Sequence, residues 1–303
     1  MRIGTAEANS TFLTQGKALA ELLMQRGYAD PIEVLVSPGA SIDNANRLHA
    51  GEIDFGYMAA NWIGRAKRGE APVKQPIDLR MVAPMNAGPL FFIVRADGPL
   101  KTFADLRGKR VCVGPLTSGM TQHAHTIFGA LGGGLRGSLA DVTPVYLSFA
   151  DGAEALARGE IDAQLQCPIP NQVMTSLDAR VALRVIEYSA AELDTLLAKV
   201  PFYRRAVMRK GALRALTTDQ PQPGVLNVLV CHARADNDLV QRVAGAIATG
   251  ANELVAANAL YTGLPELFKP LATEGANALE LGGVGLHEGA VAAYRAAGLM
   301  GGV

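Results

Sequence analysis

Apolar residues recur at helical spacing in three segments of the chain. Residues 12–27 place Leu19 and Leu22 on one face, and residues 118–131 and 236–257 repeat the same period. A period near 3.6 residues gathers these side chains into one stripe, which must be buried against another element. The pattern therefore predicts three amphipathic helices at these positions.

Short apolar runs alternate with the helical segments. Short runs of mainly apolar residues are typical of strands buried on both faces of a parallel sheet. They are residues 32–36, 55–59, 80–83, 110–114, 142–149 and 163–167. Strands that alternate with helices in this way predict an α/β architecture with loops at the strand ends.

Two further runs, residues 90–95 and 225–233, break the alternation because no helix follows before the next polar stretch. We interpret them as two hinge crossings between lobes, each lobe a mostly parallel sheet flanked by helices. The length of 303 residues fits two lobes. The expected lobes are residues 1–88 with 228–303, and residues 89–227. A ligand between such lobes would lie near the carboxyl ends of strands.

Composition narrows the class of protein. Apolar residues make up 49% of the chain, which suffices for buried cores, and 28 basic residues balance 28 acidic ones. Without a basic surplus or a basic run, no nucleic-acid partner is expected.

No stretch approaches the roughly 20 apolar residues of a membrane span. No signal peptide is visible, so the sequence alone indicates a cytoplasmic protein, although removal of a leader would give the same picture.

Neither a metal site nor a catalytic constellation emerges. Cys112, Cys167 and Cys231 each lie in an apolar run and are expected to be core residues, with a Cys112–Cys167 bond left open. His123 and His125 would point to different faces of one helix, so they would not chelate a metal together. No nucleophile elbow, zincin motif or dinucleotide fingerprint is present. We expect no metal, no cofactor and no catalysis.

Small polar residues gather at three strand-to-helix junctions. A helix start exposes free backbone N–H groups and a partial positive charge, which together hold carboxylates or phosphates. The alternative role of each residue is ordinary N-capping. The junctions carry Thr5, Ser10 and Thr11, then Ser41 and Asn44, then Thr117, Ser118 and Gly119.

At these same residues the chain is similar to the TAXI family, the extracytoplasmic solute receptors of TRAP transporters. The likeness extends over nearly the full length. The run at residues 101–111 is shared by many two-lobed receptors, whereas residues 201–203 and 286–295 narrow the resemblance to this family. The motifs that carry it are residues 4–5, 11–16, 41–44, 50–56, 101–111, 118–119, 146–149, 159–163, 201–203 and 286–295.

The resemblance implies a type II periplasmic-binding fold, a periplasmic location, TRAP membrane subunits as partners and a monomeric receptor without catalysis. It also implies an organic acid or amino acid as ligand, like glutamate or oxoglutarate. The ligand-binding residues expected from the junctions and the family's motifs are Thr5, Ser10, Thr11, Phe12, Ser41, Asn44, Met58, Asn61, Thr117, Ser118, Gly119, Met120 and Pro168.

Several positions depart from the family's pattern. Phe12 replaces a usual tyrosine, Met120 a frequent threonine, and Met58 leads into a loop where polar side chains are common. Each change removes a hydroxyl or amide from the expected site. The sequence therefore predicts a ligand with a larger apolar part than glutamate, still with one carboxylate.

Two other functions remain open from the sequence. An enzyme on the same architecture, making a cofactor precursor, would need a reactive His, Cys or metal cluster in the cleft. A cytoplasmic ligand-sensing domain would need an attached DNA-binding segment, whereas Met1 leads directly into the first strand.

Overall fold

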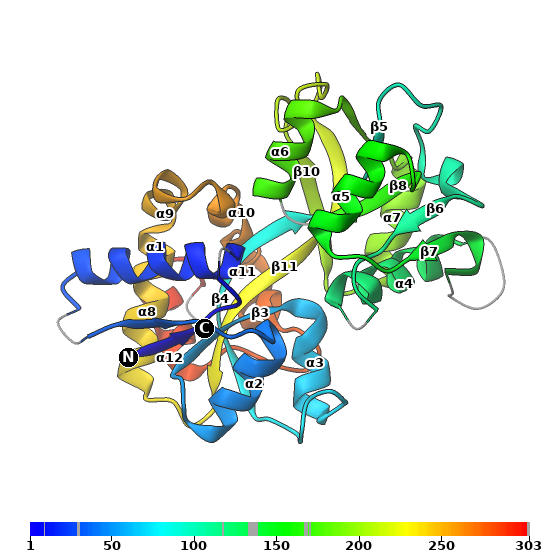
Figure 1. Ribbon diagram of the computed structural model, residues 1–303. Coiled ribbons are helices and arrows are strands. Elements are labelled where there is room, and N and C mark those ends of the chain that lie inside the picture. Colours follow the sequence, from blue (N-terminus) through cyan, green and yellow to red (C-terminus); the bar gives the residue numbers. More distant parts are fainter. Residues whose placement is uncertain are drawn as a thin grey trace. The chain divides into compact units, whose positions relative to one another are not determined.

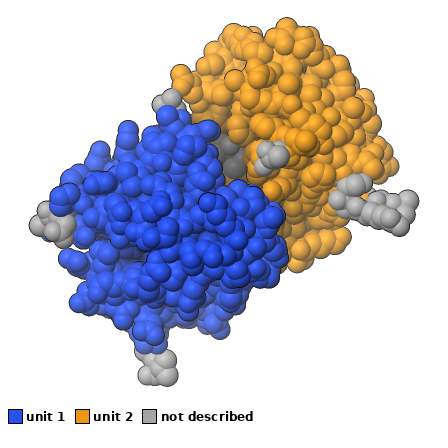
Figure 2. All heavy atoms as spheres, turned by 60° about the horizontal axis from the view of Figure 1, so that its bottom comes forward, with its two compact units in different colours: residues 1–87, 226–303 blue, residues 88–225 orange. Residues whose placement is uncertain are grey.

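The computed structural model describes residues 1–8, 10–28, 31–116, 118–132, 139–166, 169 and 171–301. The chain forms two compact units, coloured separately in Figure 2: residues 1–87 with 226–303, called unit 1, and residues 88–225, called unit 2. The chain changes unit within two long strands, β4 (Leu79–Pro89) and β11 (Gln220–His232). The first change precedes residues 90–95, which the sequence pattern assigned to a crossing.

Unit 1 is built on a sheet whose centre is parallel. Strand β1 (Arg2–Gly4) pairs with β2 (Glu33–Leu35) on one side and with β3 (Phe55–Ala59) on the other, both parallel. The distal part of β11 pairs antiparallel to β3, with Val228 opposite Met58. The carboxyl ends of β1, β2 and β3 therefore lie along one edge of this sheet.

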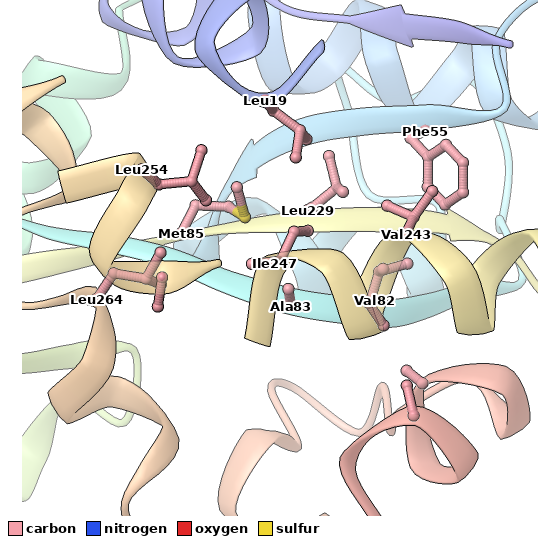
Figure 3. Packing of buried hydrophobic residues seen from close by; sticks show 14 of the residues in the cluster. Leu19, Phe55, Val82, Ala83, Met85, Leu229, Val243, Ile247, Leu254 and Leu264 are labelled. Atoms are coloured by element: carbon pink, nitrogen blue, oxygen red, sulfur yellow. The ribbon is translucent and has the colours of Figure 1, made fainter. Parts of the chain in front are cut away.

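Helices surround the sheet of unit 1 (Figure 1). They include α1 (Thr11–Gln25), α2 (Ala40–Ala50), α3 (Ala60–Arg68), α8 (Asn237–Thr249), α9 (Ala251–Ala257), α10 (Leu264–Phe268), α11 (Leu271–Glu274) and α12 (Glu288–Ala296), with 3-10 turns at Ala259–Tyr261 and Gly275–Leu279. Figure 3 shows their core, where Leu19 of α1 and Val243 and Ile247 of α8 meet Leu229 of β11. Burial of such aliphatic side chains stabilises the unit by about 1.5–3 kcal/mol each.

The helix predicted for residues 236–257 is two helices, α8 and α9, divided at Gly250. A side chain on Gly250 would begin 2.7 Å from the Ala246 carbonyl oxygen and 2.8 Å from Leu22 Cδ2. The glycine thus lets the chain turn against α1. The apolar period alone misses this break, because the stripe continues through the turn to Leu254.

Unit 2 contains a five-stranded sheet in the order β7-β6-β8-β5-β9. Strand β6 (Arg110–Cys112) pairs parallel with β7 (Thr143–Val145) and β8 (Ala163–Gln166). Strand β5 (Phe91–Arg95) pairs antiparallel with β8 and β9 (Leu183–Val185). Residues 91–95 are thus a central strand of this sheet, with Phe91 and Ile93 fully buried.

The remaining elements of unit 2 complete its core, and the strand among them, residues 203–208, pairs antiparallel with β11 instead of joining this sheet. They are α4 (Gly119–Leu131), α5 (Phe149–Arg158), α6 (Gln172–Arg180), α7 (Ala190–Lys199), β10 (Tyr203–Met208), and 3-10 turns at Phe103–Leu106 and Leu139–Asp141. The strand predicted for residues 142–149 ends at Val145. The shortening has a local cause, because the Ser148 hydroxyl accepts a hydrogen bond from the Asp151 N–H (3.1 Å) and starts α5.

Candidate functional site

Asn44 joins the carboxyl ends of two parallel strands in unit 1. Its Nδ2 donates hydrogen bonds to the carbonyl oxygens of Thr5 (2.7 Å) and Tyr57 (2.9 Å), just after β1 and within β3. Gly4 leaves the space it needs, since a Cβ there would lie 2.3 Å from Asn44 Oδ1. The amide is completely buried, so Asn44 builds this edge of the sheet.

The hydroxyls of Thr5 and Ser41 bind backbone within the same edge. Thr5 Oγ1 donates to the Leu35 carbonyl (2.8 Å), and Ser41 Oγ accepts from the Ala59 N–H (3.0 Å). Both residues are buried, at 0% and 4% exposure. Three of the sequence-predicted residues, Thr5, Ser41 and Asn44, are therefore brought together around the ends of β1, β2 and β3.

Helix α1 begins beside this edge. Ser10 is its N-cap and accepts a hydrogen bond from the Leu13 N–H at 3.2 Å. Thr11 is half-buried at the first helical position, and Phe12 packs against the Tyr57 ring with centroids 5.5 Å apart. Phe12 thus belongs to the core of unit 1 as well as to the start of α1.

Helix α3 starts without a side-chain cap. Its N-cap is Ala59, and Met58 before it is fully buried. Asn61, in the first turn, has a buried Oδ1 without a hydrogen-bond partner among the described protein atoms. The alternative role of Asn61 as an N-cap is excluded, so its amide oxygen and the first N–H groups of α3 remain available to a bound polar group.

A buried polar network lies behind this edge. The Tyr57 and Tyr261 hydroxyls are 2.8 Å apart, and Tyr261 donates to the Gln15 carbonyl oxygen at 2.8 Å. Burial raises the pKa of both phenols, so both stay protonated. The Gln15 side chain is fully buried and unpartnered among the described residues. The one sequence signal for this network is a glutamine on the buried face of a predicted helix.

In unit 2 the corresponding loop connects β6 to α4. Ser118 is the N-cap of α4, with its hydroxyl 3.2 Å from the Thr121 N–H, and Thr121 Oγ1 donates to the Pro115 carbonyl oxygen at 2.8 Å. Gly114 adopts a φ of 92°, which favours glycine, and so turns the chain into this loop. Gly119 and the nearly buried Met120 open the helix. Thr117 lies outside the described residues.

The end of β8 adds two buried amides on one strand face. Gln164 Nε2 donates to the Phe149 carbonyl oxygen at 3.0 Å, while Gln166 Nε2 has no partner among the described protein atoms. Both side chains are 1% exposed. Pro168 and Cys167 follow this strand and lie outside the described residues, whereas Cys112, the other cysteine of the bond that the sequence left open, is a free thiol.

One buried histidine lies close to the start of α4. His123 Nδ1 is 2.9 Å from the Tyr203 hydroxyl, and burial lowers the His123 pKa to about 4. The imidazole is therefore neutral near pH 7 and cannot act as a cation toward a ligand. This contact ties α4 to β10.

Reactive groups are scarce in the described part of the chain. It contains no cluster of three metal-ligating side chains. Cys112 and Cys231 are buried free thiols, and burial raises the Cys231 pKa to about 12, so its thiolate is not populated at neutral pH. Arg80 forms an ion pair with Asp78. His287 caps α12, accepting from the Gly289 N–H at 3.2 Å.

The two-unit α/β architecture, with sheets and helix starts of this kind, is the type II periplasmic-binding fold. The chain belongs to the NMT1-like family, which matches residues 3–298.

Solved structures share this fold at low sequence identity. The periplasmic aliphatic sulphonate binding protein SsuA from Escherichia coli is 21% identical, with 92% of this chain and 82% of that chain covered and a TM-score of 0.55. XAC2383 from Xanthomonas citri, solved with ATP, is 14% identical, with 88% and 89% covered and a TM-score of 0.53. A Streptococcus mutans structure described with glutathione import via GshT and the cystine ABC importer TcyBC is 13% identical, with 88% and 95% covered and a TM-score of 0.51.

No helix in the described ranges combines the length and the apolar character that crossing a bilayer requires.

Proposed function

We propose that this protein is an extracytoplasmic solute-binding receptor that closes around a small organic acid and releases it unchanged. The observation that carries the proposal is the type II periplasmic-binding fold, with hydroxyls, amides and helix starts gathered at the carboxyl ends of parallel strands in each unit. Open α/β sheets bind ligands at such strand ends. A ligand that contacts both units would favour the closed arrangement.

The proposed binding residues divide into two roles. Helix starts at α1, α3 and α4 offer N–H groups and a positive dipole end to the acid group. The side chains around them set shape and polarity. The proposed set is Thr5, Ser10, Thr11, Phe12, Ser41, Asn44, Met58, Asn61, Thr117, Ser118, Gly119, Met120 and Pro168.

The proposed ligand has a larger apolar part than glutamate and carries one acid group. Phe12 and Met120, where the resembled family usually has hydroxyls, carry a ring and a thioether instead, whereas Met58 is fully buried in unit 1. SsuA, with the same fold, is named for aliphatic sulphonates, which also join one anionic group to a hydrocarbon. Both acid types suit a site in which backbone N–H groups provide the positive pole.

We further propose that the receptor is periplasmic and monomeric and delivers its ligand to TRAP membrane subunits as a TAXI-type receptor. This assignment rests on the motifs at residues 201–203 and 286–295. Proteoliposomes that hold TRAP subunits would accumulate the ligand only when the receptor is added. Uptake that is independent of the receptor would contradict this partner.

A thermal-shift screen of organic acids tests the ligand class. A binder at a hundred times its Kd adds roughly 2.7 kcal/mol of stability to the folded state. We expect hydrophobic carboxylates or sulfonates to raise the melting temperature more than glutamate does. Stabilisation by glutamate with no response to hydrophobic acids would reject the predicted ligand class.

We also propose that the protein does not chemically alter the acid that it binds. The described thiols are buried and His123 of α4 is neutral near pH 7, so neither provides a ready thiolate or a general acid. Mass spectrometry of a binding acid after prolonged incubation with the protein should return the same mass. A time-dependent product would favour the cofactor-precursor enzyme instead.

A further inference from the structure

Large apolar side chains that remain exposed are unevenly placed along the described chain. The four are Met24 (55% exposed), Val36 (46%), Leu116 (65%) and Tyr146 (40%). Isolated exposed apolar residues are ordinary on protein surfaces. Three of these four, however, lie in connections that follow parallel strands. Leu116 and Tyr146 follow the neighbouring strands β6 and β7 of unit 2, and Val36 follows β2 of unit 1.

The backbone around Leu116 and Tyr146 is held in place by hydrogen bonds. The Val113 N–H donates to the Val145 carbonyl oxygen at 3.0 Å, which extends the β6–β7 pairing up to Tyr146. The Pro115 carbonyl oxygen accepts from the Ser118 N–H at 2.8 Å, which fixes the turn that carries Leu116. Both exposed side chains thus lie beside hydrogen-bonded backbone.

Each of the two apolar residues lies next to a helix start. Leu116 is two residues before Ser118, the N-cap of α4, and Tyr146 is two residues before Ser148, the N-cap of α5. The start of α4 thus combines helix N–H groups, which can hold an anion, with exposed hydrocarbon at Leu116. The first turn of α5 already holds the Asp151 carboxylate, and there Tyr146 contributes its ring alone. A ligand with an acid group and an apolar tail matches this combination.

We propose that Leu116 and Tyr146, which we call the apolar pair, bind the hydrocarbon part of the acid and set the preferred chain length. The inference rests on the proposed receptor function and adds two specificity-determining residues to it. Contact with the hydrocarbon tail would remove the exposed surface of both side chains from water. Acids with longer tails would therefore bind more tightly.

The test is a calorimetric titration with straight-chain carboxylates and alkanesulfonates of increasing length. Each methylene buried against the wild-type protein should tighten binding about fourfold, the factor that corresponds to ~0.8 kcal/mol. In the double variant Leu116→Ser, Tyr146→Ser, the gain per methylene should fall below about twofold, with the affinity for the shortest acids retained. The two series show whether the head group is a carboxylate or a sulfonate.

Met24→Ser is the matched control. Met24 is also exposed, but it lies in the last turn of α1, about 20 Å along the helix from its first residue. This variant should keep the wild-type gain per methylene. Because all three positions are exposed, thermal melts of the variants should match the wild type.

Three outcomes would overturn the inference. A wild-type affinity that does not change with tail length excludes an apolar tail site. If the double variant keeps the full gain in affinity per methylene, the apolar pair is not part of the tail site, although the receptor function stands. If that variant also delivers the acid to the membrane subunits poorly, the pair contacts the membrane partner instead. Failure of every acid to bind the wild type contradicts the proposed function, and the inference fails with it.

Discussion

At the scale of single residues, the polar groups of the candidate site also hold the fold together. The Asn44 amide, the Thr5 hydroxyl and the Ser41 hydroxyl each bond to backbone in unit 1. Buried polar groups need such partners, because an unsatisfied one costs about 1–3 kcal/mol. Substitutions here will therefore change stability as well as binding, and the two effects must be measured separately.

Asn44→Ala should destabilise the protein by about 2–4 kcal/mol, since it leaves the Thr5 and Tyr57 carbonyl oxygens without their buried donor. Urea unfolding measures the change. Asn46→Ala on the same helix is the control, because Asn46 is only half-buried and accepts one long contact of 3.4 Å from the Lys74 N–H. Equal losses of unfolding free energy in the two variants would contradict the role of Asn44 in joining β1 to β3.

His123 should make stability depend on pH. Burial lowers its pKa from 6.5 to about 4, so the unfolded chain binds a proton more readily than the folded protein. The stability contribution of this group is intact above pH 6.5, decreases as pH falls below 6.5, and is lost near pH 4. Between pH 7 and pH 5 the expected loss is roughly 2 kcal/mol.

The variant His123→Gln can keep a hydrogen bond to Tyr203 but does not titrate. Urea unfolding at pH 7 and pH 5 should show a larger loss for the wild type than for the variant. All other ionisable groups are the same in the two proteins, so the difference isolates position 123. Identical losses would rule out a buried neutral imidazole.

At the scale of elements, features that depend on neighbouring residues could be predicted from the sequence, whereas features that depend on contacts between distant residues could not. Ser10 and Ser118 were expected at helix starts, and both cap their helices, because capping depends on neighbouring residues. The break at Gly250 depends on Leu22, far away in the sequence. The bond between Tyr261 and Gln15 spans 246 positions, so no local pattern reports it.

The unit to which each long strand belongs could likewise not be predicted from the sequence. The pattern placed a crossing at residues 90–95, whereas the chain changes unit inside β4, which runs from Leu79 to Pro89. An apolar run shows that a strand is buried, but not which sheet it joins, since pairing partners come from distant parts of the chain. The residues that follow β1, β2 and β6 were identified as strand-to-helix connections, because strand and helix periods change there. The loop expected after Met58 was wrong, since β3 ends at Ala59 and α3 begins at Ala60.

Ser118→Ala should separate stability from binding at the start of α4. Loss of the cap should cost about 1 kcal/mol, and the loss of a hydroxyl beside the proposed acid group should weaken acid binding as well. Asp236→Ala removes the N-cap of α8, which accepts from the Leu239 N–H at 2.8 Å. Helix α8 follows β11, which runs antiparallel to β3, so this helix start lies away from the carboxyl ends of β1 and β3.

Thermal melts and calorimetry on both variants give the comparison. The two should lose similar stability, while Ser118→Ala alone should bind acids more weakly. Equal affinities in the two variants would remove Ser118 from the binding site.

At the scale of the whole molecule, two units joined by two strands form a fold that binds solutes in its structural neighbours. Each unit has its own sheet and its own core, and each offers helix starts and uncharged polar groups at the carboxyl ends of parallel strands. The described site side chains contribute hydrogen bonds and apolar contact. Such chemistry suits reversible capture of an acid.

The most direct test is a calorimetric titration of the intact chain with hydrophobic carboxylates and sulfonates, followed by mass analysis of the recovered acid. We predict saturable binding of one acid per chain, tighter than that of glutamate, with the acid recovered at its original mass. Absence of saturable binding across the series, or recovery of a converted product, would contradict a receptor function.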